Sequence, residues 1–152
     1  MSDIRNSTVR ATILDRIAKL TPEAQRQWGK MTVSQMVCHC TDQMRIALGE
    51  KTAADFGNFL HKTIIKYLVI NVIRAPKGKI KTISELDQDR EGTPPVNFES
   101  DKQLLVDIIE KFVQRSETGT FTAHPVFGKM TNEEWGKLAY KHLDHHLEQF
   151  GV

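Results

Sequence analysis

The sequence predicts a single all-α domain that spans residues 1–152 and is built as a helix bundle. Apolar residues recur every three to four positions in several segments, as they do on the buried face of an amphipathic helix. Three of these segments follow a hydroxyl residue that has Gln or Glu three positions later, which is the pattern of a capped helix N-terminus. No segment shows the strict alternation of a half-buried strand. Because each apolar stripe must be buried, we expect the helices to pack against one another.

Two helices are predicted in the first third of the chain. The first covers residues 7–20, because its apolar residues have helical spacing and Pro22 ends the run. The second begins at Thr32, whose hydroxyl group and the side-chain amide of Gln35 can each cap the other's backbone donor. It ends at about residue 48, before Gly49.

A third helical pattern covers residues 55–74. Its apolar stretch is shorter than the roughly 20 residues that span a bilayer, so we expect no stable membrane insertion. We interpret the segment as a packed core helix, with a membrane-surface or dimer-forming helix as the alternative. Its apolar surplus exceeds what one bundle face needs, which predicts a homodimer. Residues 75–99 follow, with three prolines and two glycines, and are predicted to be a long irregular connection.

Two further helices are predicted in the last third of the chain. Ser100 and Gln103 repeat the capping pattern in front of an apolar stripe. Thr131 and Glu134 repeat it in front of the last helix, which ends at Gly151.

Composition and charge narrow the range of functions. The chain has 21 Lys and Arg residues against 19 acidic residues, and its formal charge of +2 does not indicate a nucleic-acid partner. The charged N-terminal stretch lacks the apolar core of a signal peptide, which predicts a cytoplasmic protein. Cys38 and Cys40 lie two residues apart, where their side chains diverge, so we expect small buried hydrophobic residues rather than a disulfide.

The last predicted helix carries the most informative pair of residues. His142 and His146 lie four positions apart and therefore on one helix face, which also carries Leu138 and Gln149 and is expected to be buried. Burying two imidazoles is unfavourable unless their nitrogens form hydrogen bonds or coordinate a metal ion. His145 projects about 80° away from the pair and is expected at the rim of such a site.

A third histidine, His39, lies on the second predicted helix. It is about 10 Å from the start of that helix, and His142 and His146 are about 8 to 14 Å from the end of theirs. The three residues reach one level only if the two helices run antiparallel. We therefore predict one divalent metal ion held by His39, His142 and His146, with imidazoles that are satisfied by hydrogen bonds alone as the alternative. The cavity around it is expected to be lined by Gln35, Met36, Gln43, Leu138, His145 and Gln149.

Three neutral imidazoles leave coordination positions open, which is typical of catalytic rather than structural metal sites. Zinc or nickel fits such ligands, and so do iron and manganese. In one interpretation the protein is a metal-dependent transferase or hydrolase that activates a thiol or water, with a small-molecule substrate such as a low-molecular-weight thiol. In the other, the ion stabilises a non-catalytic binding or sensing module.

The residues from His124 to Phe150 read HPVFGKMTNEEWGKLAYKHLDHHLEQF, and a looser match begins at WGKMT, residues 28–32. In these residues the chain resembles the DinB-like, or YfiT-like, metal-binding four-helix bundles, in the branch with the signature HPxFGxxTxxxWGxLxYKHxxHHxxQF. The resemblance implies an up-down-down-up bundle whose long crossover contains the extra helix at residues 55–74. It also implies the ligand set of His39, His142 and His146, and it implies activities such as thiol S-transfer or metal-dependent hydrolysis.

Overall fold

The computed structural model describes residues 2–79 and 82–152, and these ranges contain helices but no strand. The helices are α1 (Ser7–Ala18), α2 (Val33–Leu48), α3 (Lys66–Asn71), α4 (Phe98–Thr118) and α5 (Asn132–Gln149). A π-helical turn, η1 (His61–Ile65), leads directly into α3, and a 3₁₀ turn, η2 (Ser84–Leu86), lies before α4. The prediction of an all-α class is confirmed.

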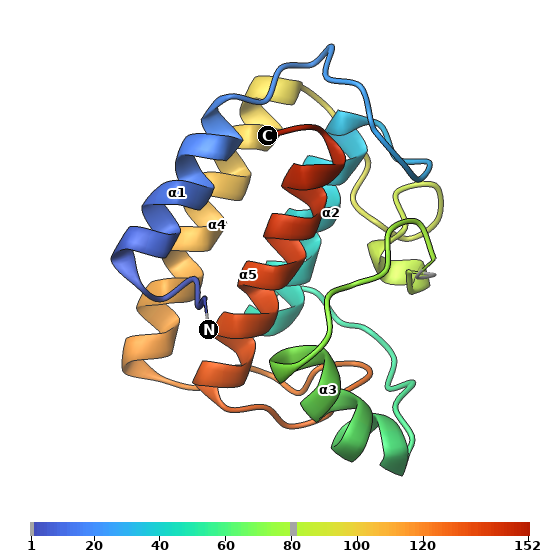
Figure 1. The fold of residues 1–152 in the computed structure, drawn as a ribbon, viewed down its shortest axis with the longest axis vertical. Helices are drawn as coiled ribbons and strands as arrows, with labels where there is room; N and C mark the ends of the chain where they lie inside the picture. The colour runs from blue at the N-terminus through green and yellow to red at the C-terminus, as the bar shows by residue number, and fades with distance from the viewer. Residues whose placement is uncertain (1, 80–81) are drawn as a thin grey trace.

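The four long helices lie side by side, and α3 packs on the outside of α5 (Figure 1). Followed along the chain in Figure 1, α1 and α5 rise through the view, whereas α2 and α4 descend. Helix α2 contacts both α4 and α5, and α1 contacts the same two helices. Helices α2 and α5 are therefore antiparallel neighbours, the relation that a shared site on their inner faces requires.

The hydrophobic core lies between the four long helices. Its largest fully buried side chain is Trp135 near the start of α5, whose indole N–H donates to the carbonyl oxygen of Thr122 at 3.2 Å. Phe121 stacks on Phe112 of α4, with 4.3 Å between the ring centroids, and its centroid lies 5.9 Å from that of Trp135. These aromatic contacts hold the start of α5 two turns before its first inward histidine.

The two helices that carry the histidines begin with the predicted capping boxes. Thr32 and Gln35 cap each other's backbone donors at the start of α2, and Thr131 and Glu134 do so at the start of α5. These boxes satisfy backbone N–H groups that have no partner within the helix. Each box therefore sets the residue at which its helix starts.

The start predicted for α4 at Ser100 and Gln103 is wrong. Helix α4 begins at Phe98, and its cap is Asn97, whose side-chain oxygen accepts from the backbone N–H and the hydroxyl group of Ser100. Asn is as good an N-cap residue as Ser, and here it lies three residues earlier.

The helix predicted over residues 55–74 is shorter in the structure, which has regular helix only in η1, α3 and the two residues before them. The backbone N–H groups of Phe56 and Gly57 instead donate to the carbonyl oxygen of Pro125, at 2.8 and 3.2 Å. These two hydrogen bonds hold residues 56 and 57 against the loop before α5, so this part of the segment does not form a helix. No helix in the described ranges is long and apolar enough to cross a membrane.

The connection from α3 to α4 is irregular apart from η2, as predicted, and residues 80 and 81 within it lie outside the described residues. It is attached to α2 through Asp42, whose carboxylate is completely buried. Asp42 accepts from the backbone N–H and the hydroxyl group of Thr93, both at 2.7 Å, and from the ammonium group of Lys51 at 2.9 Å. This attachment lies one helical turn from His39 and holds the connection against α2.

His124 is a half-buried histidine that is not one of the three predicted ligands. Its Nδ1 accepts from the backbone N–H groups of Val126 and Phe127 at 3.1 and 3.2 Å, and burial lowers its pKa from 6.5 to about 4. Because the unfolded chain takes up this proton first, the stability contributed by neutral His124 is present above pH 6.5 and is lost as the pH falls towards 4.

We expect the wild type to lose about 2 kcal/mol more stability between pH 7 and pH 5 than His124→Asn, which has no titrating group at this position. Urea unfolding at the two pH values measures the difference. An equal loss in both proteins would contradict the prediction.

Candidate metal centre

Three imidazole rings meet between α2 and α5, and they belong to the three predicted ligands. His39 lies in the middle of α2, and His142 and His146 lie on the inner face of α5. One candidate ligand atom from each ring lies within 4.8 Å of the other two. The ring centroids are 4.7 to 4.8 Å apart in all three pairs. This group of histidines could hold a metal ion.

Hydrogen bonds at Nδ1 prepare two of the rings to bind through Nε2. The Nδ1 atom of His39 lies 2.7 Å from the carbonyl oxygen of Leu86, and that of His146 lies 2.9 Å from Oε1 of Gln149. Both oxygens only accept hydrogen bonds, so each Nδ1 carries the proton and donates, and each Nε2 keeps its lone pair. Metal-bound histidines in proteins usually have this second hydrogen bond.

The third ring, that of His142, has a different environment. Its Nε2 atom lies 2.9 Å from Nε2 of His39, and its Nδ1 is buried without a hydrogen-bond partner in the described part of the chain. Two imidazole nitrogens this close share one proton or bind a common cation. The contact therefore fits a site in which the same ion binds both rings.

All three imidazoles are neutral at physiological pH. Burial lowers the pKa of His39, lowers that of His142 well below its ordinary value, and lowers that of His146 to about 3. The neighbouring rings add to the effect, because a second positive charge in the cluster is unfavourable. A divalent ion binds the neutral form, so protons compete little with it at pH 7.

Two of the predicted lining residues lie beside the rings. Gln149 accepts from His146 and donates through its side-chain amide to the carbonyl oxygen of Trp28 at 2.8 Å, which fixes the orientation of the amide. The ring centroid of His145 lies 5.2 Å from that of His146 and 5.7 Å from that of Trp28. Gln43 is 5% exposed and its Oε1 has no hydrogen-bond partner among the described residues.

The other predicted lining residues have neighbours of their own. Met36 and Leu138 are buried in the hydrophobic core cluster. The side chain of Gln35 takes part in the capping box of α2 and donates to a carboxylate oxygen of Asp89 at 2.8 Å. Its polar atoms are therefore used at the start of the helix, one turn before His39.

The two cysteines that flank His39 are free, buried thiols. Burial raises the pKa of Cys38 to about 12 and raises that of Cys40 as well. Both side chains are therefore protonated at neutral pH, the form in which a thiol is a poor metal ligand. Their environment agrees with the predicted role as small buried hydrophobic residues.

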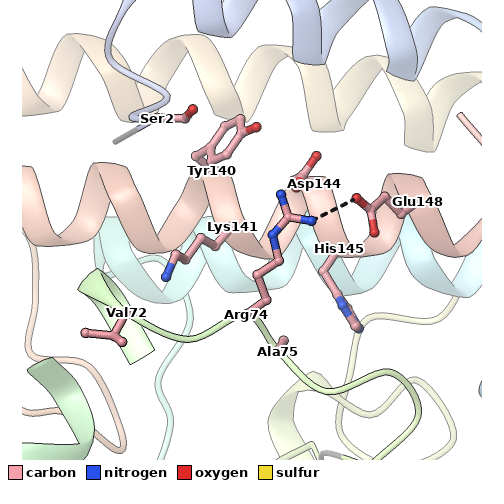
Figure 2. A pocket seen from close by; sticks show the side chains of 9 residues that line it. All are labelled: Ser2, Val72, Arg74, Ala75, Tyr140, Lys141, Asp144, His145 and Glu148. Atoms are coloured by element: carbon pink, nitrogen blue, oxygen red, sulfur yellow. Dashed lines mark ion pairs between the residues drawn. The ribbon is translucent and has the colours of Figure 1, made fainter. Parts of the chain in front are cut away.

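A cavity of about 250 Å³ opens beside His145, on the outer side of α5 (Figure 2). Val72 and Arg74 line it from the end of α3, and Glu148 lines it from α5. The Arg74 guanidinium group points across the cavity towards Glu148, at a distance of 3.9 Å between charged atoms. His145 thus borders both this cavity and the ring of His146.

Sequence reasoning missed two groups that support the site. The Leu86 carbonyl group comes from an irregular segment, and a backbone acceptor has no signature in the side-chain pattern. Asp42 has a weak signal, because it is the single acidic residue of α2 and needs partners once it is buried. Arg45 and Lys51 are close in sequence, but Thr93, which attaches the connection to α2, lies 51 residues along the chain, so the sequence does not identify it.

A comparison with protein-family models found a match over nearly the whole chain. The model described as "Protein of unknown function (DUF1569)" matches residues 5–151. The chain belongs to the DUF1569 family. Comparisons with curated proteins and with solved structures gave no match. The function of this DUF1569 protein is therefore argued from its site.

We expect Gln149→Ala to weaken metal binding without removing a ligand. The substitution takes away the acceptor of the His146 Nδ1–H group, and such outer hydrogen bonds typically contribute about 10- to 100-fold to metal affinity. Competition titration with a chelating dye measures the change in Kd for zinc. As a control we choose Gln103→Ala, because Gln103 pairs with Asp107 on the exposed surface of α4. Equal zinc affinity in Gln149→Ala and the wild type would contradict the prediction.

Proposed function

We propose that this DUF1569 protein binds one divalent metal ion through His39, His142 and His146 and uses the ion to activate a bound nucleophile. The observation that carries the proposal is the convergence of three neutral imidazoles, two of which have Nδ1 engaged by an acceptor and therefore keep the lone pair on Nε2. The proposal includes the DinB-like up-down-down-up bundle. The helix directions in Figure 1 and the position of α3 between α2 and α4 in the chain support that arrangement.

The chemistry follows from the charge of the ligand set. With three neutral ligands a bound zinc or nickel ion keeps its full charge and open positions, and it lowers the pKa of a thiol or water molecule that it binds. The protein's own residues hold the rings in place and keep them unprotonated. Leu86 and Gln149 fix the orientation of His39 and His146, and burial disfavours the charged form of all three imidazoles.

We favour transfer of a low-molecular-weight thiol over hydrolysis. Water attack usually needs a general base, and the three carboxylates nearest the histidines in sequence already have partners. Asp42 is bound by Thr93 and Lys51, and Asp144 pairs with Arg16 at 2.6 Å. Glu148 lies 3.9 Å from Arg74 and 3.8 Å from Lys77. A metal-bound thiolate needs no such base, because it is itself the nucleophile.

The test begins with protein purified without a nickel column. Elemental analysis should find about one equivalent of zinc or nickel, and a screen of low-molecular-weight thiols with an alkyl halide should find metal-dependent thioether formation. In this reaction the thiolate sulfur forms a bond to carbon, halide leaves, and the thiol proton goes to solvent. The proposal would be contradicted if the rate of thioether formation were equal with and without metal, or equal in His39→Ala and the wild type.

A non-catalytic module is the second candidate, and one observation favours it. His39 and His146 are only 4% and 8% exposed, so an ion there is well placed to join α2 to α5. Metal would then raise the melting temperature in proportion to the logarithm of its concentration, with no turnover of any thiol in the screen. Thermal unfolding with and without zinc, combined with the screen, separates the two candidates.

A further inference from the structure

The outer face of η1 and α3 is unusually apolar. Among the residues that the structure describes, eight of the ten exposed large hydrophobic side chains lie between positions 56 and 73. We call these eight residues the α3 patch: Phe56, Phe59, Leu60, Ile64, Tyr67, Leu68, Val72 and Ile73. Their exposed fractions run from 37% for Leu68 to 83% for Phe59. A patch of this kind on a soluble surface usually marks an interface.

The inner face of the same segment is packed and anchored. Ile70 is completely buried, and Ile65 and Val69 pack against the core. The ammonium group of Lys141 on α5 donates to the carbonyl oxygens of Val69 and Ile73, at 2.7 and 2.9 Å. The segment is therefore firmly held, and it is apolar on both faces. A helix that is hydrophobic all round is normally covered on both sides.

The charged residues within the segment indicate what kind of partner covers the α3 patch. Residues 56–73 contain two lysines and no acidic residue, and both lysines are engaged within the protein. Lys62 pairs with Asp55 at 2.6 Å, and Lys66 donates to a backbone carbonyl at 3.2 Å and lies 3.5 Å from Glu134. A membrane-surface helix needs free cations beside its apolar face to meet anionic headgroups. The next two cations, Arg74 and Lys77, lie 3.9 and 3.8 Å from Glu148 and so also face an acidic partner. The paired cations instead resemble the surroundings of the apolar, charge-depleted centre of a homodimer interface.

The size of the patch also matches a second protein copy. Its eight side chains are about half exposed, and a large side chain presents about 200 Å² when fully open, so the patch offers roughly 800 Å². A standard stable interface buries about 800 Å² on each partner.

We propose that two copies of this chain associate through the α3 patch in a two-fold symmetric dimer. In such an interface the same patch serves both copies, so one set of apolar residues supplies both sides. Val72 belongs to the patch and also lines the cavity beside His145, so the second copy borders that cavity. The inference does not depend on the metal or on catalysis.

Sedimentation velocity over a concentration series tests the dimer. We expect the wild type to sediment as a dimer and Phe59→Glu and Ile64→Glu to raise its dissociation constant at least about 100-fold, because each places a charge in the apolar interface. The matched control is Val96→Glu, since Val96 is 88% exposed and lies outside the patch. It should remain dimeric, as should Ile64→Val.

Three results would overturn the proposal. The wild type could stay monomeric throughout the series, or the dimer could be unchanged in both patch variants. The third is binding of the wild type to vesicles of phosphatidylserine and phosphatidylcholine that Phe59→Glu loses, which would assign the patch to a lipid surface. Phe59 is 83% exposed and contributes little to the core, so its variant should keep the wild-type melting temperature and metal content.

Discussion

Replacing His142 or His146 with alanine abolishes stoichiometric metal binding in this protein, whereas His145→Ala retains most of it. The first two substitutions each remove one of three converging ring nitrogens, and a divalent ion with two imidazole ligands is held far more weakly. His145 contacts the ring of His146 but is not among the converging ligands, so its loss leaves the ligand set intact.

Elemental analysis of each purified variant, followed by zinc titration, measures the effect. We expect about one equivalent of metal in the wild type and in His145→Ala, and almost none in the other two proteins. Far-ultraviolet circular dichroism should show the same helix content in all four, because the ring cluster contributes no backbone hydrogen bonds to α5. Equal metal loss in all three variants would refute the roles assigned to these histidines.

Asp42→Ala lowers the free energy of unfolding by about 3 kcal/mol, the largest loss of stability that we predict. The substitution removes the acceptor for the Thr93 N–H and hydroxyl groups and leaves the ammonium group of Lys51 without its carboxylate. Breaking a buried pair in this way is far more harmful than breaking a surface pair.

Urea denaturation measures the loss, and Asp15→Ala is the matched control. Asp15 pairs with Lys19 on the exposed face of α1, so its removal should change stability by less than about 0.5 kcal/mol. The connection that carries Leu86 also loses its attachment to α2 in Asp42→Ala, so zinc affinity should fall together with stability. Equal stability in Asp42→Ala and Asp15→Ala would show that the buried carboxylate does not hold this connection.

Local sequence patterns predicted the parts of this protein whose geometry is local. The four-residue spacing of His142 and His146 places both on one face of any α-helix, and the Thr131–Glu134 box positions the start of that helix. The prediction failed at the start of α4, where two good caps compete and Asn97 lies before Ser100. It also failed at residues 55–58, where the N–H groups of Phe56 and Gly57 donate to the carbonyl oxygen of Pro125 instead of continuing a helix.

The sequence by itself determined the all-α class, the helix starts at Thr32 and Thr131, and three histidines able to meet if α2 and α5 run antiparallel. These features follow from helical periodicity and capping, which act over three or four residues. Only the tertiary structure decided that the Leu86 carbonyl orients His39 and that the end of α3 forms a cavity with α5. Those contacts join segments 47 residues or more apart, and their partners are backbone or surface groups without a local signature. They depend on how the irregular connection crosses the bundle, which no short sequence pattern specifies.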